Sequence, residues 1–376
     1  MTDAPASSMG LDRAASTLEL FFDLVFVLAV TQVVAIFEET HSAAGTLRGA
    51  MLLMMFWWTW GLFTWTTNWT GTDTLLIRLT LLAAMAGLLL LAGAVPEAYT
   101  TAGAWLGGAY LAVRYTAALV YFLGVRESPQ QRAALLTFLP FAMVPPLVVL
   151  AGGLVDDPAR TVLWLASIAV DLVAAALAGR GEWHVAARHF AERHGLFVII
   201  ALGESIIAIG VSAVGTPRTL VQAAALVVSF VIAAALFWSY FHGAAPAAER
   251  KLDALVGKQR GRFARDFYTI LHFPIVLGIV LFAVASEEIV AHPSDPLSGY
   301  GRFAIVVGTS LVLVSLAVGL HHATTRLPLD RLVAVLVIAA AALATQAAPG
   351  LVTAIVVAVV VIAALVGEER RRIVVD

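Results

Sequence analysis

Long apolar runs separated by short polar connections recur along the whole chain. Runs of about 18 to 25 residues match the length of helix that crosses a bilayer core about 30 Å thick. The pattern predicts twelve transmembrane helices, at residues 17–37, 46–69, 75–95, 101–124, 133–152, 160–179, 195–214, 219–242, 267–290, 302–321, 328–347 and 350–366. Four residues, 347–350, separate the last two runs, so a single kinked excursion is the alternative there.

Composition supports the same fold class. Of the 376 residues 61% are hydrophobic and 13% are charged, whereas soluble domains carry about 25% charged residues. We therefore expect an all-α, polytopic transmembrane helical bundle.

The net charge of −2 gives no bulk attraction to nucleic acid, and the absence of Cys excludes disulfides, thiolate catalysis and Cys-ligated metals. The polar first residues lack an apolar run of their own, so we expect no cleaved signal peptide and a multi-pass protein of the cytoplasmic (inner) membrane.

The distribution of positive charge predicts the orientation, since Lys and Arg accumulate on cytoplasmic loops. Most of the 23 Lys and Arg residues lie on the tails and on alternate loops. The opposite loops carry Arg48, Arg160, Arg218 and Arg302, and Arg114 lies inside a predicted span. An even number of spans with both termini in the cytoplasm follows.

This topology suggests two halves of six helices each. The expected parts are a cytoplasmic tail at 1–16, a first half at 17–190, a second half at 191–366 with a cytoplasmic loop at 243–266, and a tail at 367–376. One alignment of the halves places the Thr31-Gln32 pair opposite the Glu204-Ser205 pair. A 6+6 parallel repeat, as found in some transporters, is therefore a further expectation.

The first predicted helix contains two acids. Glu19, Asp23 and Thr31 are spaced so that they share one helical face. A carboxylate in a membrane helix is costly and must face protein or water. Near a helix N-terminus it can instead complement the helix dipole, which is the simpler interpretation of Glu19 in particular.

Three further charged residues lie deeper. Glu204 is nine residues in from Gly195, about 14 Å along a helix, and Asp171 and Arg114 lie at similar depths in their own spans. We expect Arg114 to pair with Glu204 or Asp23. Asp23, Asp171 and Glu204 together outnumber Arg114, the one arginine inside a predicted span. The excess negative charge would be balanced by protons or by a bound cation. The alternative is a static buried network that fixes helix packing.

Aromatic and histidine-rich segments are less specific. Trp57 and Trp58 lie too deep for an interfacial belt and could hold an organic cation, although core packing is the simpler role. His184, His189 and His194 are spaced by five residues and do not share one helical face, so we expect a solvated junction and no metal site. No sequence motif of a soluble enzyme or of cofactor binding occurs, and we expect neither catalytic residues nor a cofactor.

Three long segments carry a resemblance to a known family. They are ELFFDLVFVLAVTQ (19–32), HFAERHGLFVIIALGESIIAIG (189–210) and RDFYTILHFPIVLGIVLFAV (265–284). On these segments the chain resembles the bacterial low-temperature-requirement A family of integral membrane proteins. The resemblance implies a multi-span inner-membrane protein without an assigned catalytic role. It implies these signature positions: Glu19, Phe22, Asp23, Glu192, Arg193, Gly195, Gly203, Glu204, Arg265, Asp266, Tyr268 and His272.

Taken together, the sequence favours a transporter or channel for protons, cations or a small solute, working through an intramembrane polar cluster. The expected pathway residues are Glu19, Asp23, Thr31, Gln32, Arg114, Asp171, Glu204, Ser205 and His272. Two alternatives stay open. One is a non-transporting membrane protein of cold or envelope adaptation, and the other is an intramembrane enzyme acting on lipids, with Glu204 or His272 at a lateral opening. The expected partner is the lipid bilayer, and the oligomeric state is left open.

Overall fold

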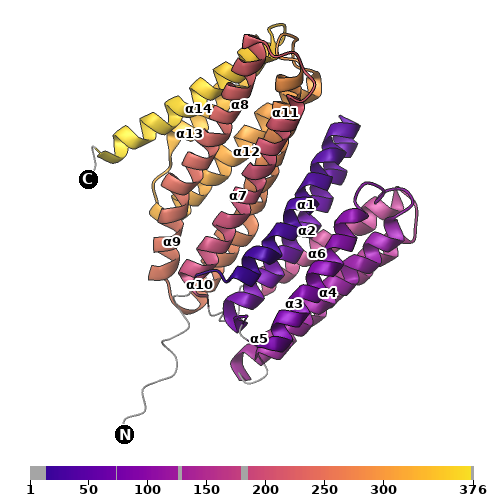
Figure 1. Ribbon diagram of the computed structural model, residues 1–376. Helices are drawn as coiled ribbons and strands as arrows, with labels where there is room; N and C mark the ends of the chain where they lie inside the picture. The colour runs from indigo at the N-terminus through magenta and orange to yellow at the C-terminus, as the bar shows by residue number, and fades with distance from the viewer. Residues whose placement is uncertain (1–13, 73, 126–128, 179–184, 374–376) are drawn as a thin grey trace. The chain divides into compact units, whose positions relative to one another are not determined.

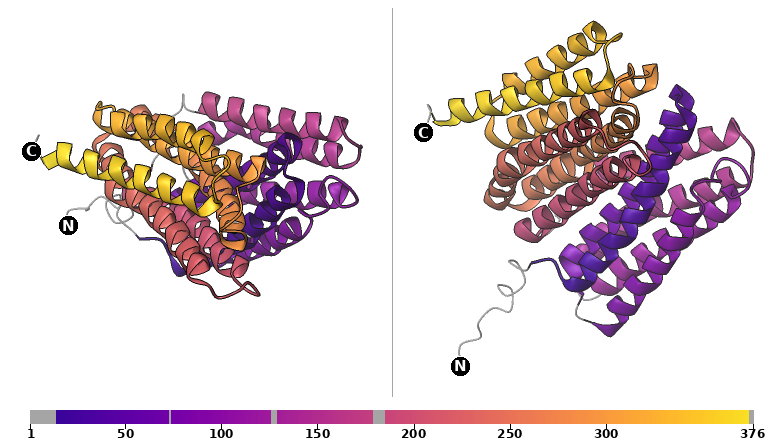
Figure 2. Two further views of the ribbon diagram at one scale, coloured as in Figure 1. Left: turned by 90° about the horizontal axis from the view of Figure 1, so that it is seen from above. Right: turned by 45° about the horizontal axis from the view of Figure 1, so that its top comes forward.

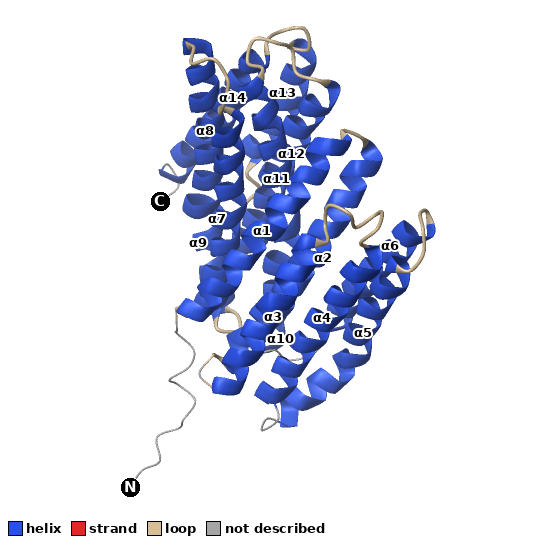
Figure 3. Cartoon of the chain, turned by 45° about the vertical axis from the view of Figure 1, so that its right-hand side comes forward, coloured by secondary structure: helices blue, strands red, loops and turns tan. Residues whose placement is uncertain are grey.

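The computed structural model describes residues 14–72, 74–125, 129–178 and 185–373. The ends of both predicted tails, 1–13 and 374–376, lie outside the described residues. The described chain is helical and contains no named β-strand, as Figure 3 shows. The helices are α1 (Thr17–Thr40), α2 (Ala43–Thr70), α3 (Leu75–Gly93), α4 (Gly103–Val125), α5 (Pro129–Gly153), α6 (Ala159–Ala178), α7 (Ala187–Ser212), α8 (Leu220–Trp238), α9 (Ala245–Ala254), α10 (Gly257–Phe263), α11 (His272–Ala291), α12 (Gly299–Thr324), α13 (Leu329–Ala344) and α14 (Gly350–Ile373), with π-helical segments η1 (Ser239–Ala244) and η2 (Ala264–Leu271).

The helices bear out a multi-pass membrane protein. A helix overlaps each of the twelve predicted segments, and within the described residues nine helices are long and apolar enough to cross a membrane. Many large apolar side chains, such as Leu24, Leu75 and Leu343, are exposed on the helix surfaces, as expected where lipid replaces water. The count of twelve spans, the side of the termini and the internal repeat stay predictions.

The chain divides into two compact units, which we describe separately. The first unit comprises residues 1–36, 44–196 and 252–269. Within it α4 packs against α3 and α5, and α5 packs against α6; these helices carry the purple to pink colours of Figure 1. Both charged networks described below lie in this unit.

The second unit comprises residues 37–43, 197–251 and 270–376. Here α11 packs against α8 and α12, α12 against α13, and α14 against α8 and α13. These helices, red to yellow, run side by side in both views of Figure 2. The contact between α11 and α12 is close at Gly278 and Gly308: a Cβ on Gly308 would lie 2.7 Å from the Gly278 carbonyl oxygen.

Helix α5 contains three prolines, Pro140, Pro145 and Pro146. A proline inside a helix lacks the N–H that would bond the carbonyl four residues earlier, so Pro146 leaves the Ala142 carbonyl without its helical partner. Arg114 Nη2 of α4 donates to that oxygen at 3.5 Å. Neighbouring helices thus supply donors to backbone groups that the prolines free, as a membrane interior requires.

Asp157 stabilises the start of α6 from outside the membrane-spanning segments. Its Oδ1 accepts hydrogen bonds from the backbone N–H and the hydroxyl of Thr161, at 3.2 and 2.6 Å, and its Oδ2 lies 2.5 Å from Arg48 Nη2. Partial burial raises the pKa of Asp157, but the bonds from Thr161 together with Arg48 and Arg160 outweigh it, so the pKa is lowered overall.

We expect Asp157→Asn to reduce stability in a pH-dependent way. An acid with a lowered pKa binds protons more weakly in the folded protein than in the unfolded one, so its contribution is present above the unfolded pKa of about 3.9 and is lost as the pH falls through the lower folded value. The exposed pair with Arg48 limits the effect to about 1 kcal/mol or less. Thermal unfolding in detergent between pH 2.5 and 6 measures it, and a difference between the two proteins that does not shrink at low pH would contradict the assignment.

Candidate functional site

Glu19 lies at the start of α1 and closes a capping box with Ser16. The Glu19 backbone N–H donates to Ser16 Oγ at 3.3 Å, while the Ser16 backbone N–H and hydroxyl donate to Glu19 Oε2 at 2.8 and 2.9 Å. The sequence Ser-x-x-Glu supplies this reciprocal arrangement at helix N-termini. Thr72 extends the chain of hydroxyls, since its Oγ1 donates to Ser16 Oγ at 3.1 Å.

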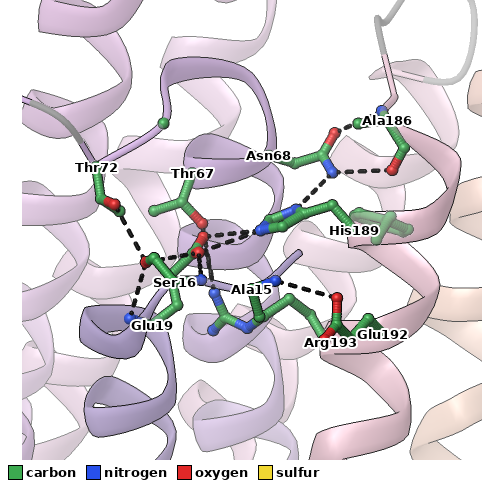
Figure 4. Close-up of polar contacts among 12 residues, drawn as sticks. Ala15, Ser16, Glu19, Thr67, Asn68, Thr72, Ala186, His189, Glu192 and Arg193 are labelled. Atoms are coloured by element: carbon green, nitrogen blue, oxygen red, sulfur yellow. Dashed lines mark hydrogen bonds and ion pairs between the residues drawn. The ribbon is translucent and has the colours of Figure 1, made fainter. Parts of the chain in front are cut away.

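His189 of α7 binds the other side of the same carboxylate. Its Nε2 lies 3.1 and 3.2 Å from the two Glu19 carboxylate oxygens. Its Nδ1 lies 2.9 Å from the amide nitrogen of Asn68 on α2. Figure 4 shows the three side chains in line.

The orientation of Asn68 fixes the tautomer of His189. Asn68 Oδ1 accepts from the backbone N–H of Ala186 at 2.9 Å, and Asn68 Nδ2 donates to the Ala186 carbonyl at 3.2 Å. The amide nitrogen therefore faces His189 Nδ1, which must be the acceptor. We assign His189 from this network as a neutral imidazole whose Nε2–H donates to Glu19.

Asp23, one helical turn further along α1, pairs with Arg193 of α7. Arg193 Nη2 and Nε donate to the two Asp23 oxygens at 2.6 and 3.1 Å, and the indole N–H of Trp60 donates to Asp23 Oδ1 at 2.8 Å. Arg193 Nη1 also lies 3.2 Å from Glu19 Oε1. The arginine therefore bridges both acids.

We call Glu19, Asp23, His189 and Arg193 the α1/α7 network. Each of the four residues is at most 2% exposed. With His189 neutral, two carboxylates face one guanidinium, so the four side chains together carry a charge of −1. Protonation of either carboxyl group changes that charge to zero.

Arg114 belongs to a second buried ion pair in the first unit. Its Nη1 and Nη2 donate to the two oxygens of Asp171 at 2.9 and 2.8 Å, and Nη1 also contacts the Tyr110 hydroxyl at 2.5 Å. The expected pairing of Arg114 with Glu204 or Asp23 is wrong, because the carboxylate that Arg114 binds is that of Asp171, while Asp23 pairs with Arg193. Arg114 and Asp171 are nevertheless brought together, as two of the predicted pathway residues.

The predicted pathway residues Glu204 and Ser205 of α7 and His272 of α11 belong to the second unit. Glu204 is buried, and Ser205 Oγ donates to the Ile279 carbonyl at 3.3 Å. His272 Nε2 lies 2.8 Å from the Tyr240 hydroxyl. Glu38 at the end of α1 hydrogen-bonds Glu287 of α11 and is within electrostatic reach of Glu204, a carboxyl group that sequence reasoning missed.

Thr31 and Gln32 lie further along α1 and are half-buried. The Thr31 hydroxyl donates to the Val27 carbonyl of its own helix at 3.0 Å. This bond satisfies the hydroxyl locally, as is common for Thr in membrane helices.

The expected solvated junction around the α7 histidines is wrong where the structure describes it. Helix α7 begins at Ala187, eight residues before the predicted span, so His189 and His194 are buried, at 0% and 1% exposure. His194 packs among rings, with Trp60 and Phe190 centroids 4.9 and 4.5 Å away. His184 lies outside the described residues. Across the described segments no group of three or more His, Asp or Glu side chains could hold a metal ion.

Comparison with known proteins places the chain in a family. The profile of the bacterial low temperature requirement A protein (LtrA) family matches residues 14–366. An uncharacterized protein of Rhizobium meliloti (strain 1021) is 30% identical over 292 residues, which cover 74% of this chain and 70% of that relative. No solved structure matches. The chain belongs to the bacterial low temperature requirement A protein family.

Proposed function

We propose that this protein is a non-enzymatic transporter of the cytoplasmic membrane that moves protons through the α1/α7 network. The observation that supports the proposal is the hydrogen bond between the Glu19 carboxylate and neutral His189, inside helices long enough to cross a bilayer. Intramembrane carboxyl and imidazole groups are the side chains from which proton relays are built.

The groups around Glu19 form a continuous series of exchangeable protons. The series runs from the hydroxyl of Thr72 through the hydroxyl of Ser16 to the Glu19 carboxylate, which also accepts from His189 Nε2–H. Each member is within hydrogen-bond distance of the next, the geometry that proton transfer needs. A proton entering by the hydroxyls can therefore reach the buried Glu19 carboxylate without crossing an apolar gap.

The charge of Glu19 links its protonation to the contacts between α1 and α7. Arg193 lies within bonding distance of both Glu19 and Asp23. Protonation of Glu19 removes its attraction to Arg193 and leaves Asp23 as the charged partner, so proton uptake redistributes the contacts that join α1 to α7. Coupling of this kind is what a proton-driven transport cycle requires.

The test uses the full chain in sealed vesicles. Wild-type protein is reconstituted with a trapped pH-sensitive dye, and a potassium diffusion potential, negative inside, is imposed with valinomycin. We expect internal acidification well above that of protein-free vesicles, and a decrease of at least tenfold for Glu19→Gln. Glutamine still completes the capping box, so this variant removes the titratable group and keeps the start of α1.

Glu192→Gln is the matched control, since Glu192 lies on the same helix as His189 but is exposed. It should acidify the vesicles at the wild-type rate. Wild-type acidification equal to that of protein-free vesicles, or Glu19→Gln vesicles as fast as wild type, would overturn the proposal in favour of a static packing network.

A further inference from the structure

A cavity of about 110 Å³ lies within the first unit, and none of the four side chains of the α1/α7 network lines it. Its walls come from α2, α4, α5, α6, α10 and η2. Trp58, Trp65 and Tyr121 line it, together with Gly61. Gly61 is buried, yet a Cβ built on it meets no described atom within 4 Å, so the cavity lies directly beside α2.

The polar groups of the cavity walls are bonded within the protein. The Trp65 indole N–H donates to Thr269 Oγ1 at 2.9 Å. Arg114 donates to the Asp171 carboxylate, which is also the acceptor of the Trp58 indole N–H. The surface left to a ligand is mainly apolar, and a cavity of this kind stays free of water and accepts apolar molecules.

The cavity is long and narrow. On α2 its lining extends from Trp58 to Thr66, eight residues or about 12 Å along the helix axis. Its volume of about 110 Å³ is nevertheless of the order of the engineered 150 Å³ cavity that takes a single benzene molecule. The space therefore suits one hydrocarbon chain and not two chains side by side.

One end of the cavity reaches the predicted cytoplasmic loop, where Gly261 and Arg265 line it. Residues 253–266 carry four basic and two acidic side chains, a net charge of +2. Arg265 contacts Asp266 at 2.6 Å, with side chains 21% and 46% exposed, and its Nη1 donates to the Ala175 carbonyl at 3.3 Å. Water weakens an ion pair as exposed as this one, so the guanidinium can bind a second anion.

A ligand that matches both parts has one apolar chain and a compact anionic head. We propose that the cavity binds a single-chain anionic lipid of the fatty-acid class, with its chain along α2 and its carboxylate beside Arg265. A carboxylate fits the fork of a guanidinium group. The basic segment attracts anionic lipid, as basic residues at a membrane surface do. A diacyl phospholipid would have to leave its second chain outside the cavity.

The test compares two probes that differ only in their heads. Tritiated hexadecanoic acid carries the carboxylate, and tritiated hexadecan-1-ol carries a neutral hydroxyl. Scintillation proximity binding to the full chain in phosphatidylcholine nanodiscs, at a pH that ionises the acid and corrected against empty nanodiscs, gives both dissociation constants. We expect saturable binding of the acid at one site per chain, at least fivefold tighter than the alcohol.

Substitutions at Arg265 test the head. Arg265→Gln should weaken binding of the acid at least threefold and leave that of the alcohol unchanged, whereas Arg265→Lys should restore most of the preference. Arg250→Gln is the matched control, because Arg250 is an exposed basic residue that does not line the cavity.

Substitutions in the walls test the chain. Gly61→Leu fills the cavity from α2, and Ala118→Leu fills it from α4; each should weaken binding of both probes at least tenfold. Gly108→Leu is the control, because Gly108 also has no described atom within 4 Å of a built Cβ and does not line the cavity. The two fillings approach from different helices, so the test stays decisive if one variant misfolds.

Equal binding of acid and alcohol to wild type, or acid binding that survives filling of the cavity, would overturn the proposal. Displacement of the acid by an equal concentration of phosphatidylglycerol would also overturn it, in favour of a diacyl lipid. Glu19→Gln should bind the acid as wild type does, because Glu19 does not line the cavity; the result is therefore independent of proton transport.

Discussion

Asp171→Ala should lower the free energy of unfolding by about 3 to 5 kcal/mol, because it leaves a buried guanidinium without its counter-charge. The side chains of Arg114 and Asp171 are 1% and 5% exposed, and two hydrogen bonds of 2.8 and 2.9 Å join them. The remaining contacts of Arg114, with Tyr110 and the Ala142 carbonyl, are neutral and cannot replace a carboxylate. Unfolding of the full chain in mixed micelles with increasing SDS measures the loss.

A double variant distinguishes a lost pair from a lost side chain. Removing both partners, as in Arg114→Met with Asp171→Ala, should recover most of the stability, since replacing a buried ion pair by apolar groups is often close to neutral. Asp156→Ala, at an exposed position before α6, should change stability by about 0.5 kcal/mol or less. A double variant as unstable as Asp171→Ala would show that packing rather than charge explains the loss.

The helices could be predicted from the sequence because a membrane helix satisfies its own backbone, and so the length of each apolar run reflects bilayer thickness. The partners of the buried charges could not be predicted in the same way. Hydropathy places a residue in depth but does not say toward which neighbour it points. The sequence predicts that Asp171 and Arg114 lie at similar depths in the membrane, but it does not predict the ion pair that joins them in the structure.

Only the α1 side of the α1/α7 network could be predicted from the sequence. Glu19 and Asp23 were recognised, but the apolar run of the seventh helix begins at Gly195, so His189 and Arg193 were assigned to a loop. A signal existed in the spacing: both pairs are four residues apart, which places each pair on one helical face. Groups of complementary charge at the same interval on two neighbouring helices can form two successive pairs. Here Glu19 contacts His189, and Asp23 contacts Arg193.

Gly308→Val should lower the free energy of unfolding by about 2 to 3 kcal/mol, within the range for overpacking a close-packed interior. A Cβ at this position would lie 2.7 Å from the Gly278 carbonyl oxygen and 2.8 Å from the Phe282 backbone nitrogen. These are backbone atoms, so no side-chain rotation relieves the contact and α12 must move away from α11. Small residues allow such close approach in membranes, where the van der Waals contact between helices is a main source of their association.

Gly210→Val provides the comparison within the same unit. Gly210 lies in α7 and is exposed, and no described atom is within 4 Å of its built Cβ, so this variant carries the same change of helix propensity without the clash. Gly308→Ala should fall between Gly210→Val and Gly308→Val, since it adds the first clashing atom but not the branches. If the three variants unfold at the same SDS concentration, α11 and α12 do not meet at Gly278 and Gly308, and the packing that organises the second unit must be sought elsewhere.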